Sequence, residues 1–148
     1  MTSTNFTTAF SVDQTPEAAF AAITNVRGWW SGQIDGDTDK LGAEFTYRYQ
    51  DIHYSKQQII ELAPNKRVVW RVQDAYLDFT EDPSEWNGTE ITFELARKGD
   101  QTEVRFTHLG LVPEFECYDS CSTAWAFYIN NSLHRLITTG QGQPNPTE

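Results

Sequence analysis

The sequence predicts one α+β domain, in which a curved antiparallel sheet of about six strands wraps around a long C-terminal helix and two short helices follow the first strand. Three observations lead to this fold class. Apolar and polar residues alternate over several short segments, as in half-buried strands. The last five of these segments are joined by turns or loops, which favours antiparallel pairing. One long segment near the C-terminus repeats its apolar residues with the period of a helix.

The N-terminal quarter of the chain predicts one strand and two short helices. Residues 6–12 place every second residue on one apolar face, which indicates a strand. Thr15 and Pro16 then predict the start of a helix, because threonine caps helix N-termini and proline fits the first helical position. Residues 25–31 predict a second short helical turn, and residues 35–40 predict a loop.

Five further strands are expected between residue 44 and residue 108. Their links are a turn at 63–66, a long connection at 74–88 and a tight turn at 98–100. The residues expected to face inward are Phe45, Tyr47, Tyr49, Val68, Trp70, Val72, Ile91, Phe93, Leu95, Val104, Phe106 and His108.

The last predicted element is a helix from about Glu116 to Thr139, which Gly140 ends. It is the one element long enough to cover the inner face of the sheet, which cannot stay exposed. Residues 140–148 form a polar tail rich in glycine and proline, so the domain spans residues 1–148 with a core of about 5–139.

Composition excludes several classes of function. The net charge of −10 and the pI of about 4.6 disfavour nucleic acids and anionic membrane surfaces, which repel an acidic protein. No apolar run reaches the roughly 20 residues of a membrane span, and the first residues do not resemble a signal peptide. We therefore expect a cytoplasmic protein that is a monomer or a weak homodimer.

Aromatic residues make up 14% of the chain, and they indicate a lined cavity between sheet and helix. The alternative is that they only fill a thick core, but close packing usually mixes aromatic with branched aliphatic side chains. We expect the cavity to bind an apolar or aromatic small molecule. The predicted ligand-binding residues are Trp29, Phe45, Tyr47, Tyr49, Trp70, Trp86, Phe93, Phe106, His108, Tyr118, Cys121 and Trp125.

No catalytic residue, metal site or cofactor is predicted. His108 faces inward as a polar anchor or a general base, or else as an ordinary core histidine. Cys117 and Cys121 are neighbours at the start of the last helix, where we interpret them as structural thiols rather than a redox pair. Residues 35–39 resemble the start of a calcium loop, but Lys40 stands where the loop requires glycine. The long connection at 74–88 could form a lid or a pinned loop.

The chain resembles the START-like (SRPBCC) superfamily, which has the helix-grip fold, and within it the branch named after the activator of the heat-shock-protein-90 ATPase. The resemblance covers residues 5–142. The residues that carry it are Phe10–Glu17, Gly28–Trp30, Glu61–Trp70, Thr102–Gly110 and Ala124–Leu133. It implies a cavity between the sheet and the last helix, because relatives bind or transform apolar and aromatic molecules such as lipids, plant hormones and polyketides.

The resemblance leaves three hypotheses for function. The first is a small-molecule binding protein, and the second is a cyclase- or aromatase-type enzyme with an acid-base residue in its pocket. The third is a chaperone-associated interaction module. The eukaryotic namesake engages the chaperone through a separate N-terminal domain, which has no counterpart in this sequence. The binding protein is therefore the leading expectation.

Overall fold

The computed structural model describes residues 5–30, 33–49, 53–77, 86–112 and 118–142. The strands are β1 (Phe6–Val12), β2 (Gln33–Gly36), β3 (Glu44–Tyr49), β4 (His53–Ala63), β5 (Arg67–Leu77), β6 (Glu90–Lys98) and β7 (Gln101–Leu109). The helices are α1 (Pro16–Thr24), the 3₁₀ turn η1 (Val26–Gly28), α2 (Tyr118–Phe127), the π-helical segment η2 (Tyr128–Leu133) and α3 (His134–Thr139).

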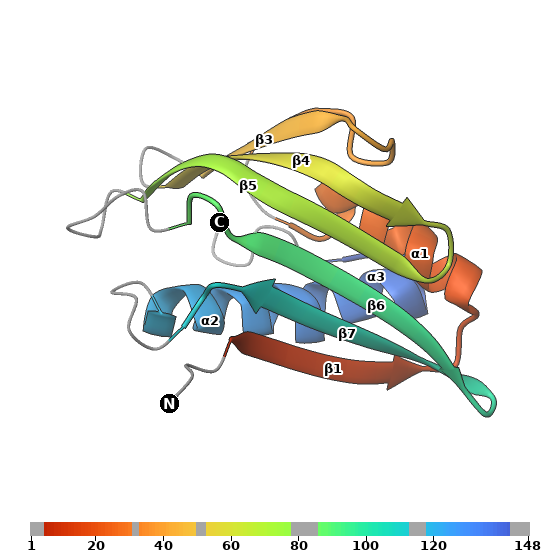
Figure 1. Cartoon of the computed structure of the whole chain (residues 1–148). Helices are drawn as coiled ribbons and strands as arrows, with labels where there is room; N and C mark the ends of the chain where they lie inside the picture. The colour runs from red at the N-terminus through yellow and green to blue at the C-terminus, as the bar shows by residue number, and fades with distance from the viewer. Residues whose placement is uncertain (1–4, 31–32, 50–52, 78–85, 113–117, 143–148) are drawn as a thin grey trace.

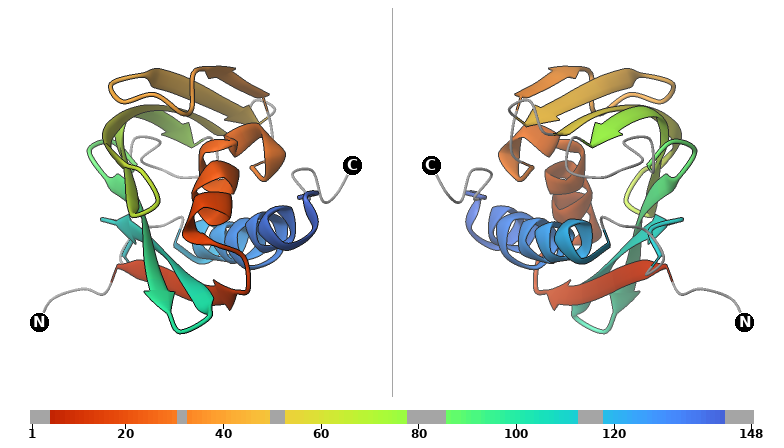
Figure 2. Two further views of the ribbon diagram at one scale, coloured as in Figure 1. Left: turned by 90° about the vertical axis from the view of Figure 1, so that its right-hand side faces the viewer. Right: turned by 90° about the vertical axis from the view of Figure 1, so that its left-hand side faces the viewer.

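The strands form one antiparallel sheet in the order β1-β7-β6-β5-β4-β3-β2 (Figure 1). The chain therefore sets its last strand beside its first and then returns along the sheet in consecutive hairpins. The sheet curls around α1 and the C-terminal helix, as the end-on views show (Figure 2). This arrangement confirms the predicted helix-grip architecture.

The C-terminal helix runs without a break from α2 through η2 to α3 across the inner face of the sheet (Figure 1). Its buried side chains repeat with helical period, at Cys121, Trp125, Ile129, Ser132, Leu133 and Ile137. Ser132 also donates a hydrogen bond of 2.7 Å to the carbonyl oxygen of Trp29. This bond ties the helix to the segment that follows α1.

The local signals for the helix ends hold in the structure. The Thr15 side chain accepts a hydrogen bond from the backbone N–H of Ala18, and Pro16 is the first residue of α1. Gly140 ends α3 with φ of 84°, a left-handed conformation that favours glycine, and its N–H bonds to the carbonyl of Leu136.

Two stretches differ from the sequence-based expectation. β2 occupies residues 33–36, so a short edge strand stands where part of a loop was predicted. β5 continues to Leu77, whereas the long connection was expected to begin at residue 74. The cause is a β-bulge: Lys56 pairs with Asp74 and Gln57 with Val72, which leaves Gln73 as an extra residue.

Across the described residues, no helix is long and apolar enough to cross a membrane.

Candidate functional site

All five tryptophans of the chain meet in one cluster between the sheet and the helices. Trp29 stacks on both Trp30 and Trp70, at ring-centroid distances of 6.1 and 6.2 Å. Trp30 lies 5.1 Å from Trp125, which in turn stacks on Trp86 at 5.9 Å. The cluster is therefore continuous from the end of α1 to the C-terminal helix.

The structure brings the predicted ligand-binding residues together at the interior. Two of them, Tyr49 and Tyr118, are half-buried, and the other ten are buried. Trp29 is fully buried, its indole N–H bonds to the carbonyl of Ile23 at 3.1 Å, and its ring packs on Phe93. Trp29 therefore serves the core, while the rings nearer to β3, β4 and α2 frame the candidate site.

His108 is held by a chain of hydrogen bonds. Its Nδ1 accepts from the indole N–H of Trp125 at 3.0 Å, so its proton is on Nε2, which donates to the Thr89 hydroxyl at 2.9 Å. Thr89 then donates to the carbonyl oxygen of Trp86 at 2.7 Å. Burial, and secondarily the nearby His53, lower the pKa of His108 from 6.5 to about 3. His108 is thus neutral with both nitrogens occupied, and this arrangement does not favour it as a general base.

His53 is a half-buried histidine on the inward-facing side of β4, and the sequence reasoning missed it. Its ring makes edge contacts with Tyr47 at 4.9 Å and with Trp86 at 4.7 Å. Burial lowers its pKa from 6.5 to about 3, so it is also neutral. Unlike the nitrogens of His108, its buried Nε2 has no hydrogen-bond partner in the described part of the chain.

Ser55 and Gln57 continue the same face of β4, and both side chains are 0% exposed. The Ser55 hydroxyl and both amide atoms of Gln57 lack a hydrogen-bond partner within the described ranges. The indole nitrogens of Trp70 and Trp86 are unpartnered in the same sense. Buried polar groups are normally hydrogen-bonded. A row of unpartnered buried atoms is therefore unusual and marks this part of the interior as a candidate site.

The strand register explains why these polar groups face the interior. Residues alternate along β4, so His53, Ser55 and Gln57 share the inner face with Ile59. Ser55 pairs with Tyr47 on one side and with Ala75 on the other. The bulge at Gln73 allows both Val72 and Ala75 to point inward, which places a small side chain beside Ser55.

The sequence held a signal for this polar row. Three polar residues at every second position end in Ile59, a buried residue of the same parity. Trp30 was also missed, although it stacks on Tyr47 at 3.9 Å with the rings 8° from parallel. It follows Trp29 directly, and both indoles of the pair face the core.

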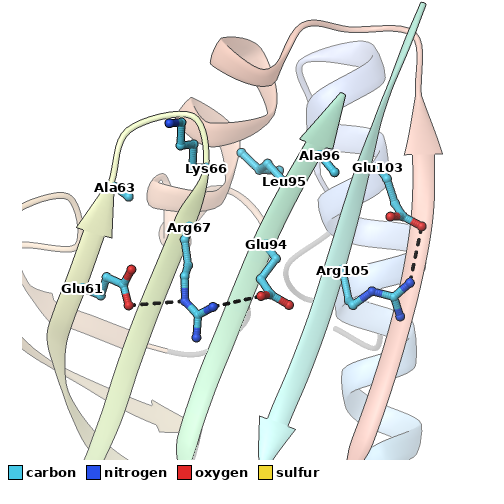
Figure 3. A pocket seen from close by; sticks show the side chains of 9 residues that line it. All are labelled: Glu61, Ala63, Lys66, Arg67, Glu94, Leu95, Ala96, Glu103 and Arg105. Carbon is cyan, nitrogen blue, oxygen red and sulfur yellow. Dashed lines mark hydrogen bonds and ion pairs between the residues drawn. The ribbon is translucent and has the colours of Figure 1, made fainter. Parts of the chain in front are cut away.

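A surface hollow of about 480 Å³ lies on the opposite face of the sheet (Figure 3). Its charged residues largely pair with one another: Arg67 bridges Glu61 at 3.3 Å and Glu94 at 2.9 Å, and Arg105 contacts Glu103 at 3.5 Å. Exposed ion pairs of this kind contribute little to stability. The hollow is mixed in charge, whereas the described residues of the interior include no buried Asp, Glu, Lys or Arg.

The remaining predicted features have these positions. Within the described residues, no group of three or more His, Cys, Asp or Glu could hold a metal ion. Cys121 is buried in α2, while Cys117 lies outside the described residues. Residues 78–85 of the predicted lid also lie outside them, but Trp86 at its end is buried. The roles proposed for the thiols and the lid stay predictions.

Comparison with known proteins bears on the family. The family model described as "Activator of Hsp90 ATPase homolog 1-like protein" matches residues 13–138. No match is found among curated proteins. The solution structure of the Aha1 dimer from Colwellia psychrerythraea is similar, with 28% sequence identity and a TM-score of 0.75. That match covers 94% of this chain and 99% of the other.

More distant structures share the fold alone. CalU16 from Micromonospora echinospora is 16% identical with a TM-score of 0.64, and the match covers 93% of this chain and 76% of that one. DynU16, from the dynemicin biosynthetic locus, is 15% identical with a TM-score of 0.69, over 92% of this chain and 48% of that one.

Proposed function

Because this chain belongs to the Activator of Hsp90 ATPase homolog 1-like family, of the START-like (SRPBCC) superfamily, we propose that it binds an apolar or aromatic small molecule between its sheet and its C-terminal helix. The observation that carries the proposal is the row of buried polar atoms on β4 without partners in the described residues, above all the amide of Gln57.

Energetics support a ligand at this row. An unsatisfied buried polar group lowers the free energy of unfolding by about 1–3 kcal/mol. The Ser55 hydroxyl and the Gln57 amide together therefore destabilise the domain substantially, since domains are only marginally stable. A bound molecule with polar atoms removes this cost, and ordered water would do so in part. Such a molecule would gain affinity from groups that the protein already holds in place.

The rings around the polar row supply the apolar part of the proposed site. Trp86 lies between His53 and His108, with both ring centroids at 4.7 Å. Trp30 and Tyr47 stack on each other, and Tyr47 also contacts His53 at 4.9 Å. Aromatic walls with few polar groups are typical of small-molecule sites. We therefore assign a flat apolar body of the ligand to these rings and its polar end to β4.

Native mass spectrometry of freshly purified protein tests the proposal most directly. We expect a bound compound, which extraction would identify, or else a rise in melting temperature with apolar or aromatic compounds from a broad library. A protein without any bound mass, which no compound in the library stabilises, would sink the proposal.

The proposal also covers the oligomeric state and the cellular compartment of the protein. The similar Colwellia protein is a dimer in solution, and we propose that this chain is a monomer or a weak homodimer in the cytoplasm. Sedimentation velocity over a hundredfold range of concentration would measure it. A tight dimer at the lowest concentration, or a cell fractionation that finds the protein elsewhere, would contradict this part.

A further inference from the structure

Gln57 presents a donor and an acceptor on one planar group. Its Nε2 offers N–H donors and its Oε1 offers lone pairs, and neither atom has a partner among the described residues. A second amide satisfies both atoms at once through two antiparallel hydrogen bonds. A carboxylate has acceptors only, so it would pair the Nε2 and set an oxygen against the Oε1. A site built for both bonds rejects a molecule that leaves one buried atom unpaired.

The interior also offers no positive charge to an anionic ligand. All 11 lysines and arginines of the chain belong to the described residues, and none of them is buried. His53 and His108 are neutral at physiological pH, because burial lowers the pKa of each to about 3. A carboxylate moved into such surroundings loses its hydration without a counter-charge, which is strongly unfavourable. The net charge of −10 adds a long-range repulsion.

Ser55 supplies a further neutral hydrogen-bonding group. It lies two residues before Gln57 on the same face of β4, so the two Cα atoms are roughly 7 Å apart. A hydroxyl both donates and accepts, and it therefore places no charge requirement on the ligand. The polar row as a whole matches uncharged polar groups.

From these three observations we infer that the site prefers a neutral aromatic ligand whose donor and acceptor lie side by side, as in an aryl carboxamide or a lactam, over the matching carboxylate. The inference specifies the ligand class of the site proposed above and rests on that proposal.

Isothermal titration calorimetry at pH 7.5 with matched probes tests the preference. The probes are benzamide, benzoate and toluene, and the larger set 2-naphthamide, 2-naphthoate and 2-methylnaphthalene. In the size that fits, the amide is expected to bind at least about tenfold more tightly than the carboxylate, the ratio that one hydrogen bond of ordinary strength gives.

Two neighbouring substitutions locate the effect. Gln57→Leu is expected to weaken amide binding about tenfold and to leave hydrocarbon binding unchanged or stronger, because it removes both amide atoms and keeps an apolar side chain. Gln58→Leu is the matched control. Gln58 has the opposite parity on β4 and bonds to the Gly42 carbonyl and to Gln73, so its loss should leave all six affinities unchanged.

The outcomes separate this inference from the proposed function. The inference is wrong if a carboxylate binds as tightly as its amide, or if the Gln57→Leu variant keeps the amide preference. In either case, binding of the hydrocarbon probe would still support the proposed function. If some other apolar compound stabilises the protein but neither amide binds, the inference is wrong and the proposed function still stands. If no probe binds and the library screen is empty, both fail.

Discussion

Gln57 is a fully buried glutamine with neither amide atom paired in the described structure, and it differs in this from the interior polar residues that have hydrogen-bond partners. His108, Thr89 and Ser132 are also buried, but each takes part in a hydrogen bond. At the residue scale, the interior thus contains satisfied polar groups that fix the fold and unsatisfied ones that weaken it. The second kind is expected where function has required it.

Gln57→Leu should therefore stabilise the ligand-free protein. The change replaces an unsatisfied amide by an apolar side chain of similar size, and we expect the free energy of unfolding to rise by about 1–3 kcal/mol. Urea unfolding followed by far-ultraviolet circular dichroism measures it, with Gln58→Leu as control. A loss of stability in Gln57→Leu alone would mean that the amide is already well paired, by water or otherwise.

His53 and His108 should make the protein sensitive to mild acid, because both have lowered pKa values. Both have a folded-state pKa of about 3 against 6.5 in the unfolded chain, so the unfolded chain binds more protons between these values. Their effect vanishes about one pH unit above 6.5, and stability falls as the pH is lowered through 6.5 towards 3. At pH 5 the loss is about 2 kcal/mol for each histidine.

Urea unfolding at pH 7.5, 6.5, 5.5 and 5.0 would show this dependence. The double variant His53→Asn/His108→Asn should have a flatter profile than the wild type over the same range, whatever its stability at pH 7.5. Equal slopes in the two proteins would assign the acid sensitivity to the carboxylates instead.

At the scale of elements, the bulge in β5 decides which residues face the site. It changes the parity of the strand, so that Val72, Ala75 and Leu77 are all buried. Without it, the outward residues Asp74 and Tyr76 would turn towards the tryptophans. The strand would then place a carboxylate in an interior whose described residues include no buried charge.

Deletion of Gln73 should be tolerated, because it removes only the extra residue of the bulge and leaves Asp74 outward and Leu77 inward; we expect the free energy of unfolding to change by less than about 1 kcal/mol. Gln73→Thr keeps the length of the strand and should change stability by less than about 0.5 kcal/mol. Chemical denaturation of the two variants measures the difference. A deletion variant that is less stable than Gln73→Thr by roughly 3 kcal/mol or more would contradict this prediction and show that the strand needs the extra residue.

The same bulge shows how far sequence reasoning reaches in this chain. Alternation found β1, β3 and β7, and the helical stripe found the C-terminal helix, because each has one buried face over many residues. β5 was cut short because the bulge interrupts the alternation after Val72. β2 was missed because only Ile34 of its four residues is buried, which leaves no pattern to detect.

The candidate site was predictable to a similar degree. Buried aromatic residues such as Tyr47, Trp70 and Trp125 follow from parity and helical period. His53, Ser55 and Gln57 were missed because polar residues on a strand are ordinarily its solvent-facing side. Their inward direction depends on pairing with Tyr49, Tyr47 and Phe45, and pairing register is a property of the fold.

At the scale of the whole molecule, the proposed site lies inside the only sheet that the described chain forms, so ligand binding and folding should be coupled. A ligand that binds only the folded state at a hundred times its Kd raises the free energy of unfolding by about 2.7 kcal/mol. For a domain of this size, the melting temperature should rise by roughly 5–10 °C.

Differential scanning calorimetry with increasing 2-naphthamide checks this coupling. The melting temperature should increase with the logarithm of ligand concentration above the Kd, and Gln57→Leu should show a smaller rise at equal concentration. A constant melting temperature at saturating ligand would mean that the ligand binds the folded and unfolded states equally, which contradicts a site formed by the fold.

The tryptophan cluster has an optical consequence. The ring centroids of neighbouring indoles lie within about 6 Å of one another, which is close enough for their excited states to couple. Light absorbed by any one of them migrates to whichever indole emits at the lowest energy. A molecule that enters beside Trp86 or Trp30 would perturb the emission of all five, so the protein carries its own fluorescent reporter of whether its interior is occupied.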